Sequence, residues 1–387
     1  MSSPVTGINP DMLRWARERA GCSIGEAARA MKKSEDEIGR WETGLGAPTY
    51  PQLEKLAYQL YKRPLAIFFF PKPPAERDPH TEFRTLPEFE IENLSRATRF
   101  AIRQANAMQL ALKELNVGIN PSDRKILRDV KATPRILAAD LALQVREYLG
   151  FSLQEQISWR DNKDALEHWR SLIQDAGIFV FKDSFKPDDI SGFCLIDPEF
   201  PVVYLNNSTA AARQSFTLFH EMAHIFFNTS GITKLDDVYI SALADPARTI
   251  EVFANHFAGE CLVPSRDFDK ILRGSYNDQF IEEAAHRYHV SREVIVRKLL
   301  DRDLVSKQFF NSKYEQYKKE YQKRQKKKAG GDFYARHAAY LGDKYLQLAF
   351  GKYYQGHYGI EQLADYLGVK VQSVAGMEER FLRRAIA

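Results

Sequence analysis

The sequence contains, at residues 216–227, the stretch FTLFHEMAHIFF, in which the pattern H-E-x-x-H lies within an apolar run. On a helix, positions i and i+4 share one face, so His220 and His224 can direct two imidazoles at one metal ion. Glu221 is offset by one position and can reach a water on that metal. Zinc brings the pKa of such a water towards neutrality, and a nearby carboxylate can accept the proton. The alternative is a buried helix with two ordinary histidines.

A second apolar helix is predicted over residues 249–258, which read TIEVFANHFA. Glu251 supplies a carboxylate, and two histidines with one glutamate are a known ligand set for catalytic zinc. Asn255 follows Glu251 by one helical turn and is placed to hold a ligand in position. Taken alone, Glu251 reads as a solvated residue at a helix start, which favours the helix dipole. Together with the upstream motif, it is predicted to be the third metal ligand.

Length and composition describe a soluble globular protein of two or three domains. The 387 residues are 44% hydrophobic and 27% charged, which is ordinary for such chains. We find neither an apolar run of about 18 residues nor a signal peptide, so a cytoplasmic protein without a membrane segment is expected. The three cysteines, Cys22, Cys194 and Cys261, are far apart in the sequence, which fits a reducing compartment. A net charge of +4 does not by itself indicate nucleic-acid binding.

The N-terminal part of the chain predicts a five-helix domain with limits at residues 1–72. Ser23 and Ser34 can each cap a helix, and each is followed three residues later by a glutamate, as in a capping box. Helix, tight turn and helix at this spacing predict a helix-turn-helix. The expected helices lie at residues 10–20, 24–31, 35–43, 50–61 and 65–70.

The charge of this domain leaves two kinds of partner open. Residues 1–70 carry ten Lys or Arg and eight Asp or Glu, which is a weak electrostatic footprint for DNA. The third helix begins with three acidic residues, and Arg40 is its only base. Operator DNA contacted through Lys33 and Arg40 is one hypothesis. The other is a module that binds protein, such as another repressor by like-with-like pairing.

A proline-rich linker at residues 71–74 precedes a mixed segment. Residues 206–208 are expected to turn into the helix that carries H-E-x-x-H, and residues 229–248 are a loop that could act as a lid. A small sheet followed by that helix predicts a zincin-like core over residues 80–310, so the fold class is α+β and mostly helical. Helices are expected at 90–116, 133–149 and 152–176, and strands at 178–181, 192–196 and 201–205.

The C-terminal third is predicted to be helical throughout. Residues 280–300 read as helix, turn and helix with Ser291 as the cap, and packing is the preferred interpretation. Residues 311–331 are rich in lysine with interleaved tyrosines and predict a basic helical linker. A charge run of this kind is usually a solvated face, with nucleic-acid contact as the alternative. Residues 332–387 are expected to form a helical C-terminal domain for protein contact.

Two segments resemble known families. Residues 10–70, with SIGEAA at 23–28 and IGRWETG at 38–44, are similar to the Xre/Cro-repressor family. Residues 80–310 resemble the ImmA/IrrE metallopeptidase family, and one departure is Cys261, where an apolar residue is usual. The motifs that carry this second resemblance are EFRT at 82–85, VYLN at 203–206, RQSFTLFHEMAH at 213–224, and EVFANHFA at 251–258 followed by LVP at 262–264.

The resemblances imply a function. They imply zinc held by His220, His224 and Glu251, with Glu221 as general base. The implied enzyme is a zinc-dependent endopeptidase that cleaves a helix-turn-helix repressor or an antitoxin. Such cleavage relieves repression of a stress, mobile-element or defence operon. The N-terminal resemblance implies a DNA-binding domain whose third helix enters the major groove.

Other interpretations stay open. The chain is alternatively a transcriptional regulator or toxin–antitoxin component whose zinc core binds or senses without proteolysis, and a purely structural zinc is a third reading. The retained Glu221 favours the enzyme, because a pure binder has no chemical need for it. A second copy of the chain is a further candidate partner, as a homodimer. The sequence does not fix a partner for the oxyanion, and the neighbours that could serve are more commonly structural: Tyr204, Arg213, Tyr239 and His256.

Overall fold

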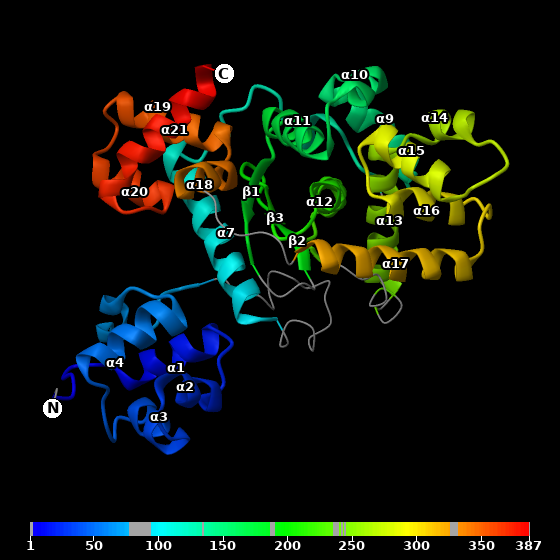
Figure 1. Ribbon diagram of the computed structural model, residues 1–387. Coiled ribbons are helices and arrows are strands. Elements are labelled where there is room, and N and C mark those ends of the chain that lie inside the picture. Colours follow the sequence, from blue (N-terminus) through cyan, green and yellow to red (C-terminus); the bar gives the residue numbers. More distant parts are fainter. Residues whose placement is uncertain are drawn as a thin grey trace. The chain divides into compact units, whose positions relative to one another are not determined.

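The computed structural model of the chain describes residues 3–76, 94–133, 135–185, 190–234, 240, 243, 245–325 and 332–386. The chain divides into two compact units, residues 1–104 and 105–387 (Figure 1). The EFRT motif at 82–85 lies outside the described residues. Among the helices that are described, none has both the length and the apolar character that crossing a membrane requires.

The first unit contains the predicted helix-turn-helix. Ser23 accepts a hydrogen bond from the backbone of Glu26, whose side chain accepts in return from the backbone of Ser23. Ser34 caps the next helix by accepting from the backbone of Glu37, without the reciprocal bond. These caps start the two helices of the motif at the predicted positions. The elements are α1 (Pro10–Arg19), α2 (Ile24–Met31), α3 (Glu35–Glu42), α4 (Tyr50–Glu54), η1 (Lys55–Tyr61), which continues α4, and η2 (Leu65–Phe69).

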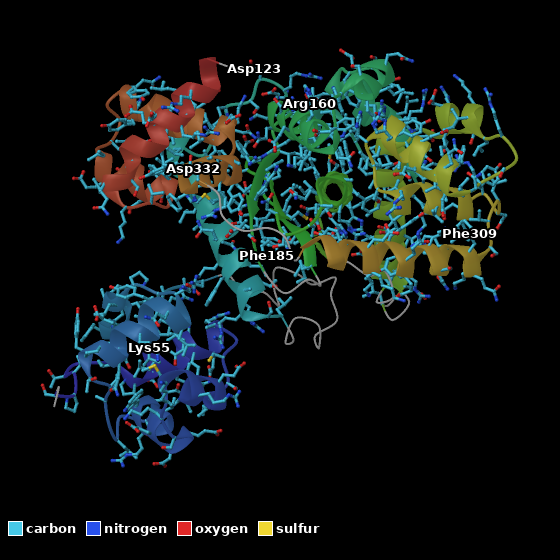
Figure 2. The ribbon with its side chains drawn as sticks, viewed as in Figure 1. Lys55, Asp123, Arg160, Phe185, Phe309 and Asp332 are labelled. Atoms are coloured by element: carbon cyan, nitrogen blue, oxygen red, sulfur yellow. The ribbon has the colours of Figure 1, made fainter. Side chains whose placement is uncertain are left out.

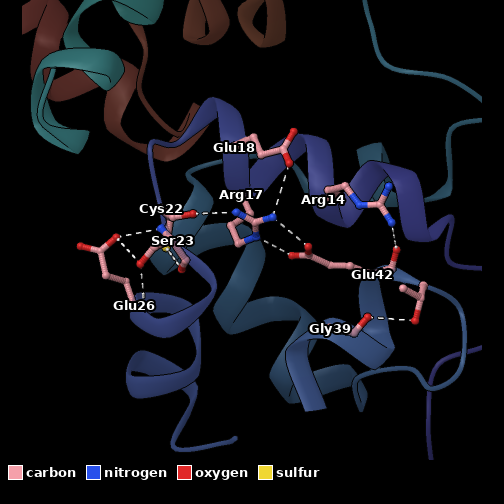
Figure 3. A network of polar contacts seen from close by, with 9 residues as sticks. Arg14, Arg17, Glu18, Cys22, Ser23, Glu26, Gly39 and Glu42 are labelled. Carbon is pink, nitrogen blue, oxygen red and sulfur yellow. Dashed lines mark hydrogen bonds and ion pairs between the residues drawn. The ribbon is translucent and has the colours of Figure 1, made fainter. Parts of the chain in front are cut away.

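A buried ion pair joins α1 to the end of α3 (Figure 3). Arg17 donates from Nε and Nη2 to the two carboxylate oxygens of Glu42, at 2.7 and 2.9 Å. Its Nη1 donates to the carbonyl oxygen of Cys22 at 3.0 Å. Both charged side chains are buried, so each depends on the other for compensation of its charge.

Replacement of Glu42 by glutamine is therefore expected to lower the local free energy of unfolding by about 3 kcal/mol, because it leaves the buried Arg17 charge without its buried partner. Hydrogen exchange of the α1 and α3 amides in the full chain measures this loss. Glu18 is the matched control, since it also faces Arg17, at 3.5 Å, but is 60% exposed. Glu18→Gln should change the same quantity by less than about 0.5 kcal/mol. Equal effects of the two substitutions would contradict this account.

A four-stranded mixed sheet forms the centre of the second unit, in the order β1-β3-β2-β4. Strand β1 (Phe179–Asp183) pairs in parallel with β3 (Val202–Asn206), and β2 (Ile190–Leu195) runs antiparallel to both β3 and β4 (Ile232–Lys234). The three predicted strands are confirmed. Strand β4 was not predicted, because three residues are too few to show an alternating pattern, and it occupies part of the expected loop at 229–248.

Helix α12 (Ala211–Phe226), which carries H-E-x-x-H, packs against β2, β3, α11 (Asn162–Asp175) and α13 (Asp245–Leu262), as Figure 1 shows. Trp169 of α11 is fully buried. Its ring meets Phe219 of α12 edge-on, with centroids 5.0 Å apart. Large aromatic contacts of this kind hold the helix in one position and keep water away from its inner face.

Three predicted helices are shorter than expected. The helix expected at 90–116 is α7 (Arg96–Leu115), because Ser95 accepts from the backbone of Thr98 at 3.2 Å and so caps it; residues 90–93 lie outside the described part. The helix expected at 133–149 is α9 (Ala138–Leu149), because Thr133 precedes a proline, which disfavours helical geometry, and Leu137 is still extended. The helix expected at 152–176 is two helices, α10 (Leu153–Ser158) and α11. The chain breaks there because Asp161 accepts from two backbone amides at the start of α11 and so caps it. Arg160 lies in this turn (Figure 2).

The C-terminal helices belong to the same compact unit as the sheet. Arg170 of α11 donates to the carbonyl oxygens of Ala339 and Tyr340 at 2.6 and 2.9 Å, and Asp332 (Figure 2) caps the first helix of this group. Residues 326–331 of the basic stretch lie outside the described part. Helix α7 (Arg96–Leu115) contributes to both units, and Ser291 caps α16 (Arg292–Leu300) as expected. The remaining helices are α8 (Ile126–Asp129), α14 (Ser265–Ile271), α15 (Asp278–Tyr288), α17 (Lys307–Gln325), α18 (Phe333–Leu341), α19 (Asp343–Tyr354), α20 (Ile360–Leu367), η4 (Val371–Ser373) and α21 (Val374–Ile386).

Candidate metal centre

Helices α12 and α13 bring the three expected ligands together. Their ligand atoms lie within 4.8 Å of one another, and all three side chains are buried. Glu251 Oε2 is 3.2 Å from His220 Nε2, Glu251 Oε1 is 3.3 Å from His224 Nε2, and the two Nε2 atoms are 3.2 Å apart. The sequence predicted Glu251 at the start of this helix. In the structure it lies in the second turn of α13. The helix begins earlier, at Asp245, because Pro246 is well tolerated in a first turn.

Hydrogen bonds on the far side of each ring determine where its proton lies. Asn255 Oδ1 is 3.0 Å from His220 Nδ1 and can only accept. The Thr229 hydroxyl donates to the carbonyl oxygen of His224 at 3.1 Å and is 3.3 Å from His224 Nδ1, so it accepts from this nitrogen. Both neutral rings therefore carry the proton on Nδ1 and present a lone pair on Nε2.

This donor set fits a bound cation. Two Nε2 lone pairs and one carboxylate converge, and with both protons on Nδ1 no hydrogen lies between the two nitrogens to offset their repulsion. Two imidazoles and a carboxylate are a donor set for zinc and for other divalent transition metals. Within the described parts of the chain, no fourth His, Cys, Asp or Glu joins the group. A metal held here would keep a position open for water or substrate.

The electrostatics of the group also favour positive charge. Burial alone would lower the pKa of His224, but the negative charge and hydrogen bond of Glu251 raise it above its ordinary value. Burial alone would raise the pKa of Glu251, but the charge of His224 and the hydrogen bonds that both imidazoles donate when Nε2 is protonated hold it well below its ordinary value. The Glu251 carboxylate is therefore ionised at neutral pH, and the site attracts a cation, whether a proton or a metal ion.

Glu221 lies next to His220 in sequence and is fully buried. Its Oε1 accepts a hydrogen bond from the hydroxyl of Thr233. Its Oε2 is buried and has no hydrogen-bond partner among the described residues. A buried carboxylate oxygen without a partner is costly, and such a position is suited to accept a proton or a water hydrogen.

Asn255→Leu is expected to weaken metal binding about tenfold or more, because His220 loses the acceptor that fixes its proton on Nδ1. Competition with a coloured chelator measures the affinity in the full chain. His256→Ala is the matched control, since His256 is the next residue of α13 but is 55% exposed and faces Asp301 at 3.9 Å. Equal losses in both variants would mean that α13 itself had been disturbed.

Three contacts of the site were not expected from sequence. Thr229 contacts His224, Thr233 contacts Glu221, and Gly231 donates from its backbone to Cys194 Sγ at 3.3 Å. Burial and the charge of Glu221 raise the pKa of the Cys194 thiol. Spacing within one helix could not reveal these partners, because they lie after the end of α12, in the turn that follows it and in β4. Thr229, five residues after His224, was the one local signal.

A cavity of about 620 Å³ adjoins the metal centre, since Asn255 and Phe216 line its wall. The helices around it are α9, α12, α13 and α16. Three ion pairs lie within its wall: Arg213 with Glu293 at 3.6 Å, Lys298 with Glu260 at 2.5 Å, and His256 with Asp301 at 3.9 Å. Two further wall residues, Arg248 and Arg302, pair with Asp245 and Asp269, which do not line the cavity. The cavity therefore offers space beside the ligands and walls whose charges are largely compensated.

The other candidates from sequence have structural contacts. Tyr204 is buried in β3 and stacks on Phe193 with ring centroids 5.2 Å apart. Arg213 and His256 are in the ion pairs just described. These contacts suit structural roles, and Tyr239 lies outside the described residues.

The two residues expected to contact DNA both have partners within α3 and the turn after it. Lys33 Nζ pairs with Glu37 at 2.8 Å, and Arg40 donates to the carbonyl oxygen of Leu45 at 3.4 Å. Glu35 and Asp36 are exposed at the start of α3. Contact of Lys33 and Arg40 with DNA therefore stays a prediction.

Comparison with protein families supports both resemblances seen in the sequence. Residues 173–300 match the peptidase M78 family, described as an IrrE N-terminal-like domain, and residues 11–61 match a helix-turn-helix domain. No curated protein is detectably similar to the chain. The chain thus contains a metallopeptidase-type domain and a helix-turn-helix domain. All three metal-ligand candidates and Glu221 fall within the first match.

Proposed function

We propose that the chain is a zinc-dependent endopeptidase of the cytoplasm that cleaves a helix-turn-helix repressor or an antitoxin and so relieves repression of a stress, mobile-element or defence operon. The observation that carries this proposal is the convergence of two Nε2 lone pairs and one carboxylate beside a buried glutamate with a free oxygen. The match to a metallopeptidase family supports it.

The residues of the site have separate tasks in this proposal. A zinc ion held by His220, His224 and Glu251 supplies a Lewis acid that acidifies a water and polarises the scissile carbonyl. Asn255 keeps the His220 ring in its Nδ1-protonated form. Glu221 accepts a proton on Oε2 and then donates it to the amine that leaves. The surrounding apolar side chains exclude bulk water, which strengthens each of these electrostatic interactions.

The flanking parts of the chain would select the partner. The proposed domains are 1–72 for helix-turn-helix binding, 80–310 for the peptidase, 311–331 for the basic linker and 332–387 for the C-terminal helices. The helix-turn-helix domain would bind operator DNA through Lys33 and Arg40, or pair with the same kind of domain in the substrate or in a second copy of the chain. The cavity beside Asn255 would accept the substrate segment next to the scissile bond.

The helix-turn-helix match supports a second candidate function, that of a transcriptional regulator or toxin–antitoxin component whose metal core senses without cutting. The buried, unpartnered Oε2 of Glu221 favours the enzyme, because a binding core gains nothing from it. The two functions differ in whether any peptide bond is broken.

The deciding experiment uses the purified full chain. Its metal content is measured by mass spectrometry, and it is incubated with the helix-turn-helix repressors and antitoxins encoded beside its gene. Cleavage that stops on chelation and returns with zinc supports the enzyme. A metal-loaded chain that cleaves none of them but shifts operator DNA supports the regulator.

A further inference from the structure

We infer that Thr229 and Thr233 are positioning residues, and that one short segment, residues 228–233, aligns both the metal-binding face of His224 and the carboxylate of Glu221. The segment comprises the turn after α12 and the start of β4. The part that concerns Thr233 rests on the proposed role of Glu221, whereas the part that concerns Thr229 rests only on metal binding.

The turn after α12 brings Thr229 next to His224. Asn228 has a φ of +53°, a left-handed conformation that asparagine tolerates and that ends helices. The chain then turns back, and Thr229 donates to the carbonyl oxygen of His224 from both its backbone nitrogen, at 2.9 Å, and its hydroxyl, at 3.1 Å. The hydroxyl is thereby held with its free lone pair towards His224 Nδ1, and the proton on that nitrogen leaves Nε2 free for metal.

Gly231 lets the segment pass directly against the same imidazole. A Cβ atom at this position would lie 2.7 Å from His224 Cδ2 and Cγ, which is too close for any other residue without movement. Two contacts hold the backbone here: Gly231 N donates to Cys194 Sγ at 3.3 Å, and Cys194 N donates to Gly231 O at 3.1 Å. The segment is therefore fixed to β2 at the point where it meets the ring.

Pairing of β4 with β2 then places Thr233. Thr233 is opposite Gly192 in the antiparallel register, and its carbonyl oxygen accepts from Ser191 Oγ at 3.2 Å. Its hydroxyl donates to Glu221 Oε1. With one carboxylate oxygen held in this way, the plane of the carboxylate is fixed, and the other oxygen, Oε2, remains open.

The three contacts recur at every second residue of the segment. Thr229 and Gly231 lie against the His224 ring, and Thr233, in β4, contacts Glu221, so all three face α12. The hydroxyls of Thr229 and Thr233, four residues apart, thus align the side chains of His224 and Glu221, which lie three residues apart on α12.

The test is a set of four variants of the full chain: Thr229→Val, Thr229→Ser, Thr233→Val and Thr233→Ser. Valine keeps the size and branching of threonine but cannot make the hydrogen bond, while serine keeps the hydroxyl. Zinc affinity is measured by chelator competition. Calorimetry measures the affinity of the zinc-loaded chain for acetohydroxamic acid. This probe is chosen because its hydroxyl needs a correctly placed acceptor carboxylate. Glu221→Gln shows how much affinity is lost when that carboxylate is absent.

Thr229→Val is expected to weaken zinc binding about tenfold, and Thr229→Ser to restore it. Thr233→Val is expected to leave zinc affinity within about twofold of wild type but to weaken acetohydroxamic acid binding about tenfold, as Glu221→Gln does, and Thr233→Ser should restore it. A general loss of packing would not separate the two readouts in this way.

Three results would overturn the inference. Unchanged zinc affinity in Thr229→Val removes the role of Thr229. Unchanged probe affinity in Thr233→Val, with Glu221→Gln weakened, removes the role of Thr233. If Glu221→Gln itself binds the probe like wild type, the proposed base fails and the role of Thr233 fails with it, whereas the zinc affinity of Thr229→Val still decides the role of Thr229.

Discussion

Replacement of Glu221 by glutamine is expected to reduce cleavage by about 10²- to 10⁴-fold, the usual contribution of a positioned general base, while the metal content stays at the wild-type level. Glutamine has the same shape, and its amide oxygen can still accept from the Thr233 hydroxyl. It cannot accept a proton, so the step that activates water and the step that protonates the leaving amine are both lost. Cleavage of the repressor or antitoxin, followed on a gel and by mass spectrometry, measures the first effect, and metal analysis measures the second.

Glu282→Gln is the control for this substitution, because Glu282 is an exposed glutamate on α15. This variant should cleave at the wild-type rate. Retained cleavage in Glu221→Gln would show that another group is the base. Lost cleavage together with lost metal would show instead that Glu221 supports the metal site, and the proposed division of roles would be wrong.

The metal-ligand candidates could be predicted because their signals are local. His220 and His224 share a face of one helix by the helical period alone, and Glu251 lies on a second helix with a clear apolar pattern. The first residue of that helix could not be predicted from the sequence. The helix starts at Asp245, which places Glu251 in its second turn. Helix ends depend on single capping or breaking residues, which is also why the break before Asp161 was missed.

The residues behind the ligands were harder to predict, because their positions depend on strand pairing. Thr233 reaches Glu221 only since β4 pairs with β2 in one particular register. Three residues of strand carry too little pattern to be recognised, and a shift of one residue would turn Thr233 away from the helix. Asn255 was predicted as a supporting residue from its place one turn after Glu251, and its oxygen contacts His220.

Replacement of Glu251 by glutamine is expected to weaken zinc binding more than about 100-fold, beyond the 10- to 100-fold typical of residues that only support a ligand. Glu251 supplies the one formal negative charge of the ligand set, and its carboxylate touches both imidazoles in a site that is 2% exposed or less. A neutral amide keeps the shape but removes that charge.

The effect on stability separates a ligand from a structural residue. At a zinc concentration about 100 times the dissociation constant, the metal should stabilise the wild-type chain by about 2.7 kcal/mol, which thermal denaturation with and without zinc detects. Glu251→Gln should show no such shift at that concentration, whereas Asp245→Asn, an exposed change on the same helix, should keep it. Without metal, Glu251→Gln should be less stable than wild type, because the interactions with both imidazoles that hold the pKa of the carboxyl low are lost, so the zinc-dependent shift is compared within each variant. A zinc-dependent shift that persists in Glu251→Gln would exclude Glu251 as a ligand.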